Sequence, residues 1–298
     1  MSEKKAAIVI DGKKTAGKIK EEIKVQVAKL IDNEDVTPHL AAIIVGEDPA
    51  SQTYVSSKEK AAQSVGILSS VYRYPESITE EELLIAIDFL NDDKGVDGFI
   101  VQLPLPKHID VDKVIARIDT EKDVDGFHPM NVGKMALGQE SFVSATPAGI
   151  VELLKRYKID TEGKHVVVLG RSNIVGSPVS ILLSKKANPG NATVTLCHSK
   201  TVNMEEITCT ADILICAIGQ PLFVKANMIK EGAVVIDVGI HRVPAKNEKG
   251  YKIVGDVDYN EVSFKAGYLT PVPGGVGPMT IAMLLKSTLD AYLRKHQS

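Results

Sequence analysis

The chain has 298 residues, of which 35 are lysine or arginine and 38 are aspartate or glutamate, so its formal net charge is −3. With 44% hydrophobic and 24% charged residues it is too apolar for a disordered chain and too evenly charged for a protein that binds nucleic acid through general positive charge. Its apolar runs are far shorter than the ~20 residues that cross a bilayer, so we expect no membrane span, and its length favours two domains.

Strands and helices alternate in the first hundred residues. Short β-branched runs are typical of strands, and between them apolar residues recur at the three- and four-residue spacing of helices. Asp48 can cap one helix, Pro49 suits its first turn, and Thr79 can open the next. Such alternation predicts a parallel sheet covered by helices. We expect strands at residues 6–10, 40–46, 68–74 and 97–102, and helices at about 16–30, 49–65 and 79–91.

Residues 103–145 break this alternation with several prolines and glycines, and we expect only one short helix there, near residues 110–118. A second α/β series follows, and a strong helix ends the chain. The second series should contain a helix at 147–157 and strands at 165–169, 192–197, 212–218 and 233–238.

We therefore predict an α/β fold with two domains. The N-terminal α/β catalytic domain should cover residues 1–143, and the C-terminal helix at residues 277–298 should pack back onto it. A Rossmann-like domain with a parallel sheet should cover residues 144–276 and bind a cofactor.

The cysteines and the N-terminus both favour the cytoplasm. Cys197, Cys209 and Cys216 contain no C-x-x-C pair and are odd in number, which favours a reducing compartment. The first apolar run is too short for a signal-peptide core. The histidines lack the spacing of a zinc site and the acidic loop at residues 121–132 lacks the last ligand of a calcium loop, so we expect no metal.

A turn typical of dinucleotide binding follows the strand at residues 165–169. Gly170 can form its tight turn, but Ser172 stands where the usual motif has a second glycine, so an ordinary strand-to-helix turn is the alternative. The next strand ends in HSKT at residues 198–201, without the carboxylate that selects NAD, and Arg171 lies on the neighbouring turn. If a dinucleotide binds, these groups favour the 2′-phosphate of NADP.

Lys58 falls on the inward stripe of the helix that Pro49 begins, one turn after Tyr54. A lysine held against apolar surface has a lowered pKa and can take part in acid–base chemistry. The alternative is snorkelling, in which the stem packs and the amine reaches water. Gln102 ends an apolar strand, where ligands gather in parallel sheets, and Asp125 can direct a carboxylate into a cleft or belong to a surface turn.

Five motifs occur together, in one order, along nearly the whole chain. They resemble those of the bifunctional methylenetetrahydrofolate dehydrogenase/methenyltetrahydrofolate cyclohydrolase family. The motifs are YVSSK at 54–58, DGFIVQLPLP at 97–106, EKDVDG at 121–126, GRSNIVGSP at 170–178 and TPVPGGVGPMT at 270–280.

The resemblance implies roles for several residues, most of them within these motifs. Lys58 matches the catalytic lysine, Gln102 the glutamine that tunes it, Asp125 the carboxylate that holds the pterin, and Tyr54 the aromatic that packs on the folate. Arg171 and Ser199 match the contacts to the 2′-phosphate of NADP. Further residues implied in binding are Pro273 and Gly274, in the loop that closes a folate cleft between the domains, and Thr146, Gly170, Ser172, Ile174 and Ile240, which line the cofactor.

The resemblance also implies two reactions. These are the NADP-dependent oxidation of 5,10-methylenetetrahydrofolate to 5,10-methenyltetrahydrofolate, and hydrolysis of that product to 10-formyltetrahydrofolate. We expect a folate substrate, no nucleic-acid or membrane partner, and a homodimer. Two competing hypotheses are a dehydrogenase that has lost the hydrolytic step and a non-catalytic nucleotide-sensing module. Lys58, Gln102 and Asp125 are all present, which argues against both.

Overall fold

A computed structural model describes residues 6–34, 36–248 and 250–296. The chain forms two compact units. The first unit contains residues 1–16 and 146–280, and the second contains residues 17–145 and 281–298. Two long helices, α1 (Gly12–Glu34) and α10 (Val276–His296), contribute residues to both units. Among the described helices, none is both long and apolar enough to cross a membrane.

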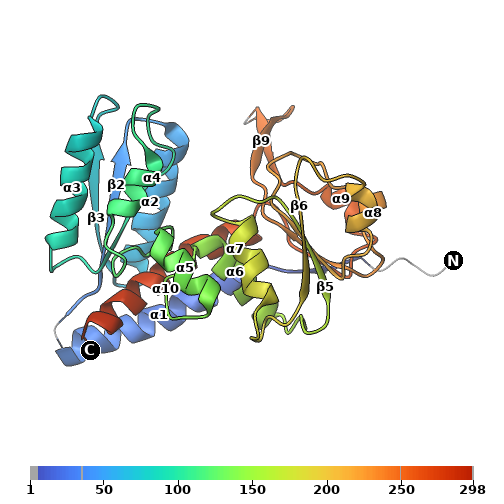
Figure 1. Cartoon of the computed structure of the whole chain (residues 1–298), viewed down its shortest axis with the longest axis horizontal. Helices are drawn as coiled ribbons and strands as arrows, with labels where there is room; N and C mark the ends of the chain where they lie inside the picture. The colour runs from blue at the N-terminus through green and yellow to red at the C-terminus, as the bar shows by residue number, and fades with distance from the viewer. Residues whose placement is uncertain (1–5, 35, 249, 297–298) are drawn as a thin grey trace. The chain divides into compact units, whose positions relative to one another are not determined.

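The first unit is built on a six-stranded parallel sheet, drawn mainly in yellow and orange in Figure 1. Its strands run nearly continuously through apolar residues, as expected of a sheet covered on both faces. In order across the sheet they are β1 (Ile8–Val9), β11 (Tyr268–Leu269), β8 (Val234–Asp237), β7 (Ile213–Cys216), β5 (His165–Leu169) and β6 (Thr193–Cys197).

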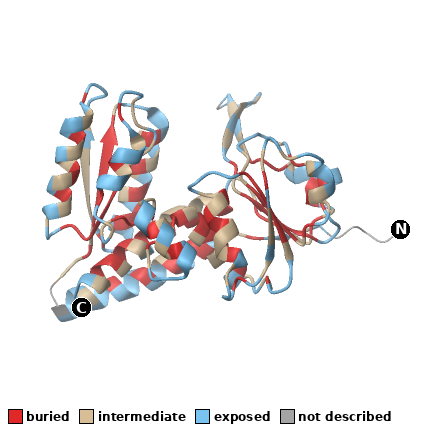
Figure 2. Cartoon of the chain, in the orientation of Figure 1, coloured by how far each residue is buried: buried red, intermediate tan, exposed pale blue. Residues whose placement is uncertain are grey.

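Helices and one hairpin complete this unit, and the buried residues lie along the strands (Figure 2). One face of the sheet packs on the short elements α8, η1 and α9, and Val167, Leu214 and Val235 belong to the buried core on that face. Helix α7 packs on β5 and β6. The remaining elements are α6 (Ala145–Arg156), α7 (Gly176–Ser184), α8 (Met204–Thr208), η1 (Ala226–Met228), α9 (Tyr259–Val262) and the antiparallel hairpin of β9 (His241–Pro244) and β10 (Tyr251–Val254).

The second unit has a three-stranded parallel sheet in the order β3 (Leu68–Tyr74), β2 (His39–Val45) and β4 (Gly98–Val101). Alternate residues of β2 face opposite sides, and Ala41, Ile43 and Val45 join the core under α3 and α4. Helix α2 packs on β2 and β3. The helices of this unit are α2 (Pro49–Ser64), α3 (Glu80–Asp92), α4 (Val111–Arg117) and α5 (Pro129–Leu137).

Residues at the start of α2 and α3 explain where these helices begin. The Asp48 carboxylate accepts a hydrogen bond from the Ser51 N–H at 2.7 Å, and Pro49 occupies the first turn. Thr79 and Glu82 form a reciprocal capping box in which each side chain bonds the other residue's backbone N–H. Both expected helix starts are therefore confirmed.

Three features differ from the sequence-based expectation. The first strand pairs with β11 in the first unit, with Ile8 opposite Tyr268, although we expected it in the N-terminal domain. Helix α5 lies in a segment where we expected one helix only; Pro129 occupies its first turn, where its missing N–H costs nothing, and His128 caps it. The β9–β10 hairpin was not expected.

Candidate active site

Lys58 is buried, with only 5% of its surface exposed, on the inward face of α2. Its Nζ donates a hydrogen bond to Gln102 Oε1 at 3.2 Å and lies 4.6 Å from the centre of the Tyr54 ring. Burial lowers the pKa of Lys58, and the negative charge of Asp125 partly opposes that shift. The amine is therefore held against protein groups, which decides against snorkelling.

Gln102 presents its oxygen to Lys58 because its amide nitrogen is already used. It follows β4 directly, and its Nε2 donates to the Leu103 carbonyl at 2.7 Å. Its backbone N–H donates to the Ile43 carbonyl at 2.8 Å, which ties Gln102 to the neighbouring strand β2. An acceptor fixed in this way can hold the lysine amine in one direction.

Asp125 interacts electrostatically with Lys58. The residue is partly exposed, yet its carboxyl group lies among protein atoms and burial raises the pKa of Asp125, while the nearby Lys58 opposes the rise. Each group shifts the other's pKa towards its charged form. The structure thus brings together in one unit the four residues Tyr54, Lys58, Gln102 and Asp125, which the sequence places on α2, after β4 and in a later loop.

Asp123 holds the loop that carries Asp125, and the sequence analysis missed it. It is 1% exposed, and its carboxylate accepts hydrogen bonds from the N–H groups of Phe127 at 3.2 Å and His128 at 2.8 Å and from Asn131 Nδ2 at 2.9 Å. Burial raises the pKa of Asp123 to about 6, and these hydrogen bonds oppose the rise. Only the folded environment distinguishes Asp123 from the acidic residues around it.

Five of the predicted cofactor residues follow strands at one edge of the larger sheet. The register places Leu169 opposite Cys197 and Cys216, and Cys216 opposite Asp237, so the carboxyl ends of β5, β6, β7 and β8 align. We call this the carboxyl edge. Gly170, Arg171 and Ser172 follow β5 there, Ser199 follows β6, and Ile240 follows β8.

The turn after β5 fits a phosphate-bearing ligand. Gly170 has a φ of +111°, and a Cβ there would lie 2.1 Å from the Ala217 carbonyl oxygen. A Cβ on Gly176, the first residue of α7, would lie 1.9 Å from the Gly170 carbonyl oxygen. Ser172 Oγ accepts a hydrogen bond from the Val175 N–H at 3.2 Å. The backbone can therefore approach a pyrophosphate closely without the second glycine of the usual motif.

The side chains of the remaining predicted cofactor residues are exposed or make a polar contact. Arg171 and Ser199 are exposed, and the side chains of Ile174 and Ile240 are 42% and 61% exposed. Thr146 Oγ1 lies 3.0 Å from Thr280 Oγ1.

Pro273 and Gly274 belong to the loop between β11 and α10. Gly274 has a φ of +108°, which favours glycine, and its carbonyl accepts a hydrogen bond from the Lys13 N–H at 2.8 Å. The structure places both residues in the first unit, and their role in folate binding stays a prediction.

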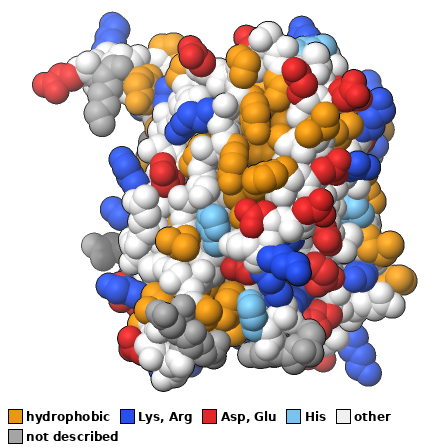
Figure 3. Space-filling view, turned by 90° about the vertical axis from the view of Figure 1, so that its left-hand side faces the viewer, with side chains coloured by type: hydrophobic (Ala, Val, Ile, Leu, Met, Phe, Trp, Pro, Cys, Tyr) orange, Lys and Arg blue, Asp and Glu red, His pale blue; other side chains and the backbone are white. Residues whose placement is uncertain are grey.

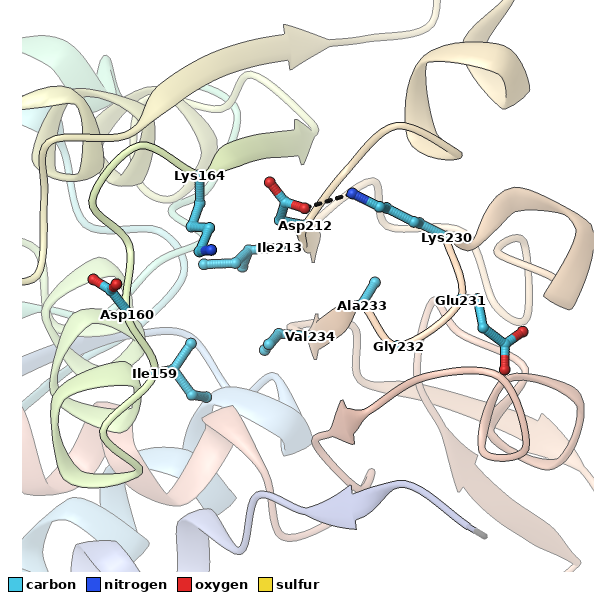
Figure 4. Close-up of a pocket in the computed structure, with 10 residues that line it drawn as sticks. All are labelled: Ile159, Asp160, Lys164, Asp212, Ile213, Lys230, Glu231, Gly232, Ala233 and Val234. Carbon is cyan, nitrogen blue, oxygen red and sulfur yellow. Dashed lines mark hydrogen bonds and ion pairs between the residues drawn. The ribbon is translucent and has the colours of Figure 1, made fainter. Parts of the chain in front are cut away.

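A pocket of about 210 Å³ lies at the opposite edge of the larger sheet (Figure 4). Lys164 precedes β5, Asp212 precedes β7 and Val234 begins β8, so the amino ends of these strands line it. Asp212 and Lys230 form an ion pair of 2.6 Å across its rim. No residue predicted from the sequence lines this pocket, and within the described part of the chain no group of three or more His, Cys, Asp or Glu side chains could hold a metal ion.

Comparison with known protein families bears on both units. The model of the tetrahydrofolate dehydrogenase/cyclohydrolase catalytic domain matches residues 10–125, and that of the NAD(P)-binding domain of the same family matches residues 144–296. The chain belongs to the tetrahydrofolate dehydrogenase/cyclohydrolase family. It is 60% identical over 284 residues to the bifunctional protein FolD of Flavobacterium johnsoniae, which covers 95% of this chain and 96% of that protein.

Solved structures of family members have the same fold. The bifunctional enzyme FolD of Campylobacter jejuni superimposes with a TM-score of 0.92 at 50% identity, covering 97% of this chain and 100% of that one. FolD of Trypanosoma brucei, solved with NADP and an inhibitor, gives a TM-score of 0.92 at 40% identity, covering 98% and 99%. The predicted family, the α/β fold class, the enzymatic activities of the family and the NADP cofactor are confirmed.

Replacing Asn131 with Ala should raise the pKa of Asp123 further, because the hydrogen bond from Asn131 lowers it. A carboxyl whose folded pKa is raised contributes stability in the protonated form, and this contribution is lost as pH rises through the folded pKa. In the variant that loss should occur at higher pH than in the wild type. Carbon-13 NMR titration of the aspartate carboxyls measures the shift directly.

Asn91→Ala is the matched control. Asn91 also bridges backbone groups of the second unit, the Arg117 carbonyl and the Asp119 N–H, both at 2.8 Å, and makes no bond to Asp123. If the pKa of Asp123 stayed the same in Asn131→Ala, or shifted equally in Asn91→Ala, the conclusion that Asp123 and Asn131 hold the Asp125 loop would be contradicted.

Proposed function

We propose that Lys58, Gln102, Asp125 and Tyr54 form the folate site of this bifunctional enzyme. The chain oxidises 5,10-methylenetetrahydrofolate to 5,10-methenyltetrahydrofolate with NADP and hydrolyses the product to 10-formyltetrahydrofolate. The observation that carries the assignment is the buried Lys58 amine, bonded to Gln102 and charge-coupled to Asp125. A structural role would be served better by an apolar side chain at that position.

The dehydrogenase step calls for orientation of the folate. NADP, when bound, accepts the hydride from the methylene carbon. The Asp125 carboxylate can accept two hydrogen bonds from the amino-pyrimidine edge of the pterin, and the Tyr54 ring offers a flat surface for the folate. Loss of a hydride from the methylene carbon of the closed five-membered ring gives the methenyl cation directly, with no proton passed to a base, so the chain contributes mainly position.

The hydrolytic step does require proton transfer. Water adds to the cationic methenyl carbon, and its proton goes to the neutral amine of Lys58, whose lowered pKa makes that form accessible. The resulting carbinolamine collapses as the bond from carbon to N5 breaks. Its hydroxyl loses a proton to solvent as the carbonyl forms, N5 takes up the proton held by Lys58, and the formyl group stays on N10. Gln102 holds the Lys58 amine, and Asp125 balances the positive charge that the amine acquires.

The carboxyl edge of the larger sheet suits NADP. The close turn at Gly170 and the N-terminus of α7 would receive the pyrophosphate, and Arg171 with Ser199 would hold the 2′-phosphate. Thr146, Ser172, Ile174 and Ile240 would line the remainder of the cofactor, and Pro273 and Gly274 would contact the folate.

We further propose a homodimer formed through the outer face of the second unit. Figure 3 shows hydrophobic side chains gathered on the side that carries α3 and β3. Leu68 on β3 is 55% exposed, and Ile85 and Phe89, one turn apart on α3, are each 61% exposed. Among the described strands β3 has a single neighbour, β2, so a second copy can both cover the apolar side chains and pair with this edge. Sedimentation equilibrium tests the dimer.

A reducing, cytoplasmic location remains a prediction from the cysteines, which are all free.

Lys58→Met should separate the two activities. Methionine keeps most of the packing of the stem and lacks the amine, so hydrolysis of the methenyl substrate should fall by roughly 10²–10⁴-fold, the usual effect of losing a general acid or base. Oxidation of methylenetetrahydrofolate should fall less, because it needs no proton acceptor. Both steps are followed by absorbance, as NADPH appears and as the methenyl compound decays.

Lys60→Met is the matched control, because Lys60 lies on the same helix with its side chain exposed. It should keep both activities. Undiminished hydrolysis by folded Lys58→Met would remove this lysine from the mechanism.

Arg171→Ala should weaken the use of NADP far more than that of NAD, because NADP alone carries the phosphate that the guanidinium would bind. The measured quantity is kcat/KM for each dinucleotide. Lys164→Ala, which removes an exposed positive charge near the amino ends of the strands, should change neither value. Equal losses for NADP and NAD in Arg171→Ala would contradict the assignment.

A further inference from the structure

Two buried carboxylates lie at the carboxyl edge, beyond the residues discussed above. Asp237 is the last residue of β8 and is 3% exposed, and Asp256 follows β10 and is fully buried. A carboxylate that is buried away from water needs hydrogen-bond donors from the protein. The donors to Asp237 and Asp256 therefore show which segments of the chain these two carboxylates hold in place.

Asp237 binds three backbone N–H groups. Its Oδ1 accepts from Gly239 at 3.0 Å and from Asp256 at 2.9 Å, and its Oδ2 accepts from Val257 at 3.0 Å. Burial raises the pKa of Asp237 to about 6, and these three bonds oppose the rise. This carboxylate therefore fastens the segment after β8 to the segment after β10.

Asp256 extends the connection to a third segment. Its Oδ2 accepts from the N–H groups of Ile218 at 2.8 Å and Gly219 at 3.0 Å, in the loop after β7. Its Oδ1 lies 2.7 Å from Nε2 of His241, the first residue of β9. A carboxylate accepts, so Nε2 is the protonated nitrogen of that imidazole. The loop after β7 and the segment after β8 are thus held by one side chain.

Glycines allow the carboxylates to approach the backbone. A Cβ on Gly239 would lie 2.4 Å from Asp256 Oδ1, and a Cβ on Gly255 would lie 1.8 Å from Asp237 Oδ2. Neither position has room for a side chain, so the arrangement depends on both the acidic residues and the glycines that receive them.

The two braced loops lie on one side of the cofactor edge. In the order β8-β7-β5-β6, the turn after β5 and the end of β6 carry the residues assigned to the pyrophosphate and the 2′-phosphate. A dinucleotide lies across such an edge with its two halves on opposite sides of the central strand. The loops after β7 and β8 therefore face the nicotinamide half. Ile240, exposed at this edge, stands between the two held residues Gly239 and His241.

We propose that His241 and Asp256 are positioning residues for the nicotinamide half of NADP. Asp256 holds the loop after β7 and, through His241, the backbone that follows Ile240, while Asp237 holds Gly239 on the other side. His241 and Asp256 act without touching the cofactor themselves. This inference rests on the proposed function, because it assumes NADP at the carboxyl edge. It concerns the first unit, whereas the residues assigned to hydrolysis all lie in the second.

The enzyme's two activities allow a test, because hydrolysis of the methenyl substrate requires no dinucleotide. His241→Ala removes the imidazole, which is 21% exposed at its side chain, and leaves the buried carboxylates in place. We expect kcat/KM for NADP in the oxidation to fall about 10- to 100-fold, as for loss of a hydrogen bond to a charged group. The rate of methenyl hydrolysis should stay within about twofold of the wild type.

Two further variants make the test specific. His241→Gln retains a donor on a side chain of similar reach and should recover part of the loss in NADP kcat/KM. His165→Ala is the matched control: His165 begins β5 at the opposite edge, with Nε2 2.9 Å from Thr195 Oγ1, and its loss should leave NADP kcat/KM unchanged.

Unchanged kcat/KM for NADP in His241→Ala would overturn the inference, and so would an equal fall in hydrolysis, which would indicate a general loss of folded enzyme. The same fall in NADP kcat/KM in His165→Ala would overturn it as well. Failure of the proposed function itself looks different: the wild-type enzyme would then show no NADP-dependent oxidation of methylenetetrahydrofolate.

Discussion

The chemistry of the second unit depends on the burial of one ammonium group. Removing Lys58 from water disfavours its charged form, and the enzyme offsets that cost with an oxygen of Gln102 and the negative charge of Asp125. A group arranged in this way loses its proton at a lower pH than a solvated lysine does, because burial lowers the pKa of Lys58. The surrounding second unit can be understood as the support for this arrangement. Helix α2 directs the amine inward, β4 ends where Gln102 must stand, and Asp123 fixes the loop that carries Asp125.

Both units use the carboxyl ends of parallel strands in the same way. Loops that follow adjacent strands emerge together, so residues distant in sequence can share a site. In the second unit Gln102 follows β4, and in the first unit Gly170 and Ser199 follow β5 and β6. Buried aspartates hold such loops in both units: Asp123 in one, and Asp237 with Asp256 in the other. Each carboxylate is kept in place by backbone N–H groups, and none of the three was singled out from the sequence.

The sequence predicted what depends on periodicity and local motifs. The helices capped by Asp48 and Thr79, the inward direction of Lys58 and every strand of the two sheets except β11 follow from the spacing of apolar residues and from capping chemistry. The resemblance to a known family supplied roles for Gln102 and Asp125 that spacing alone left open. Pairing of the two-residue strand β1 with β11 is a long-range contact with no local signal. Helix α5 was missed because Pro129 was interpreted as a helix breaker instead of a first-turn residue. His241 was missed because only the β9–β10 hairpin brings its partner Asp256 near it.

NMR titration of the lysine side chains in the wild-type enzyme tests the central claim most directly. Carbon-13 labelling at the methylene next to Nζ, with Lys58 assigned from its loss in Lys58→Met, gives the pKa of this amine beside those of exposed lysines such as Lys60 in the same spectrum. We expect Lys58 to titrate at clearly lower pH than the exposed lysines, and Asp125→Asn to lower the pKa of Lys58 further because the opposing negative charge is gone. A Lys58 that titrates together with the exposed lysines would show that its amine is solvated, and would contradict the mechanism.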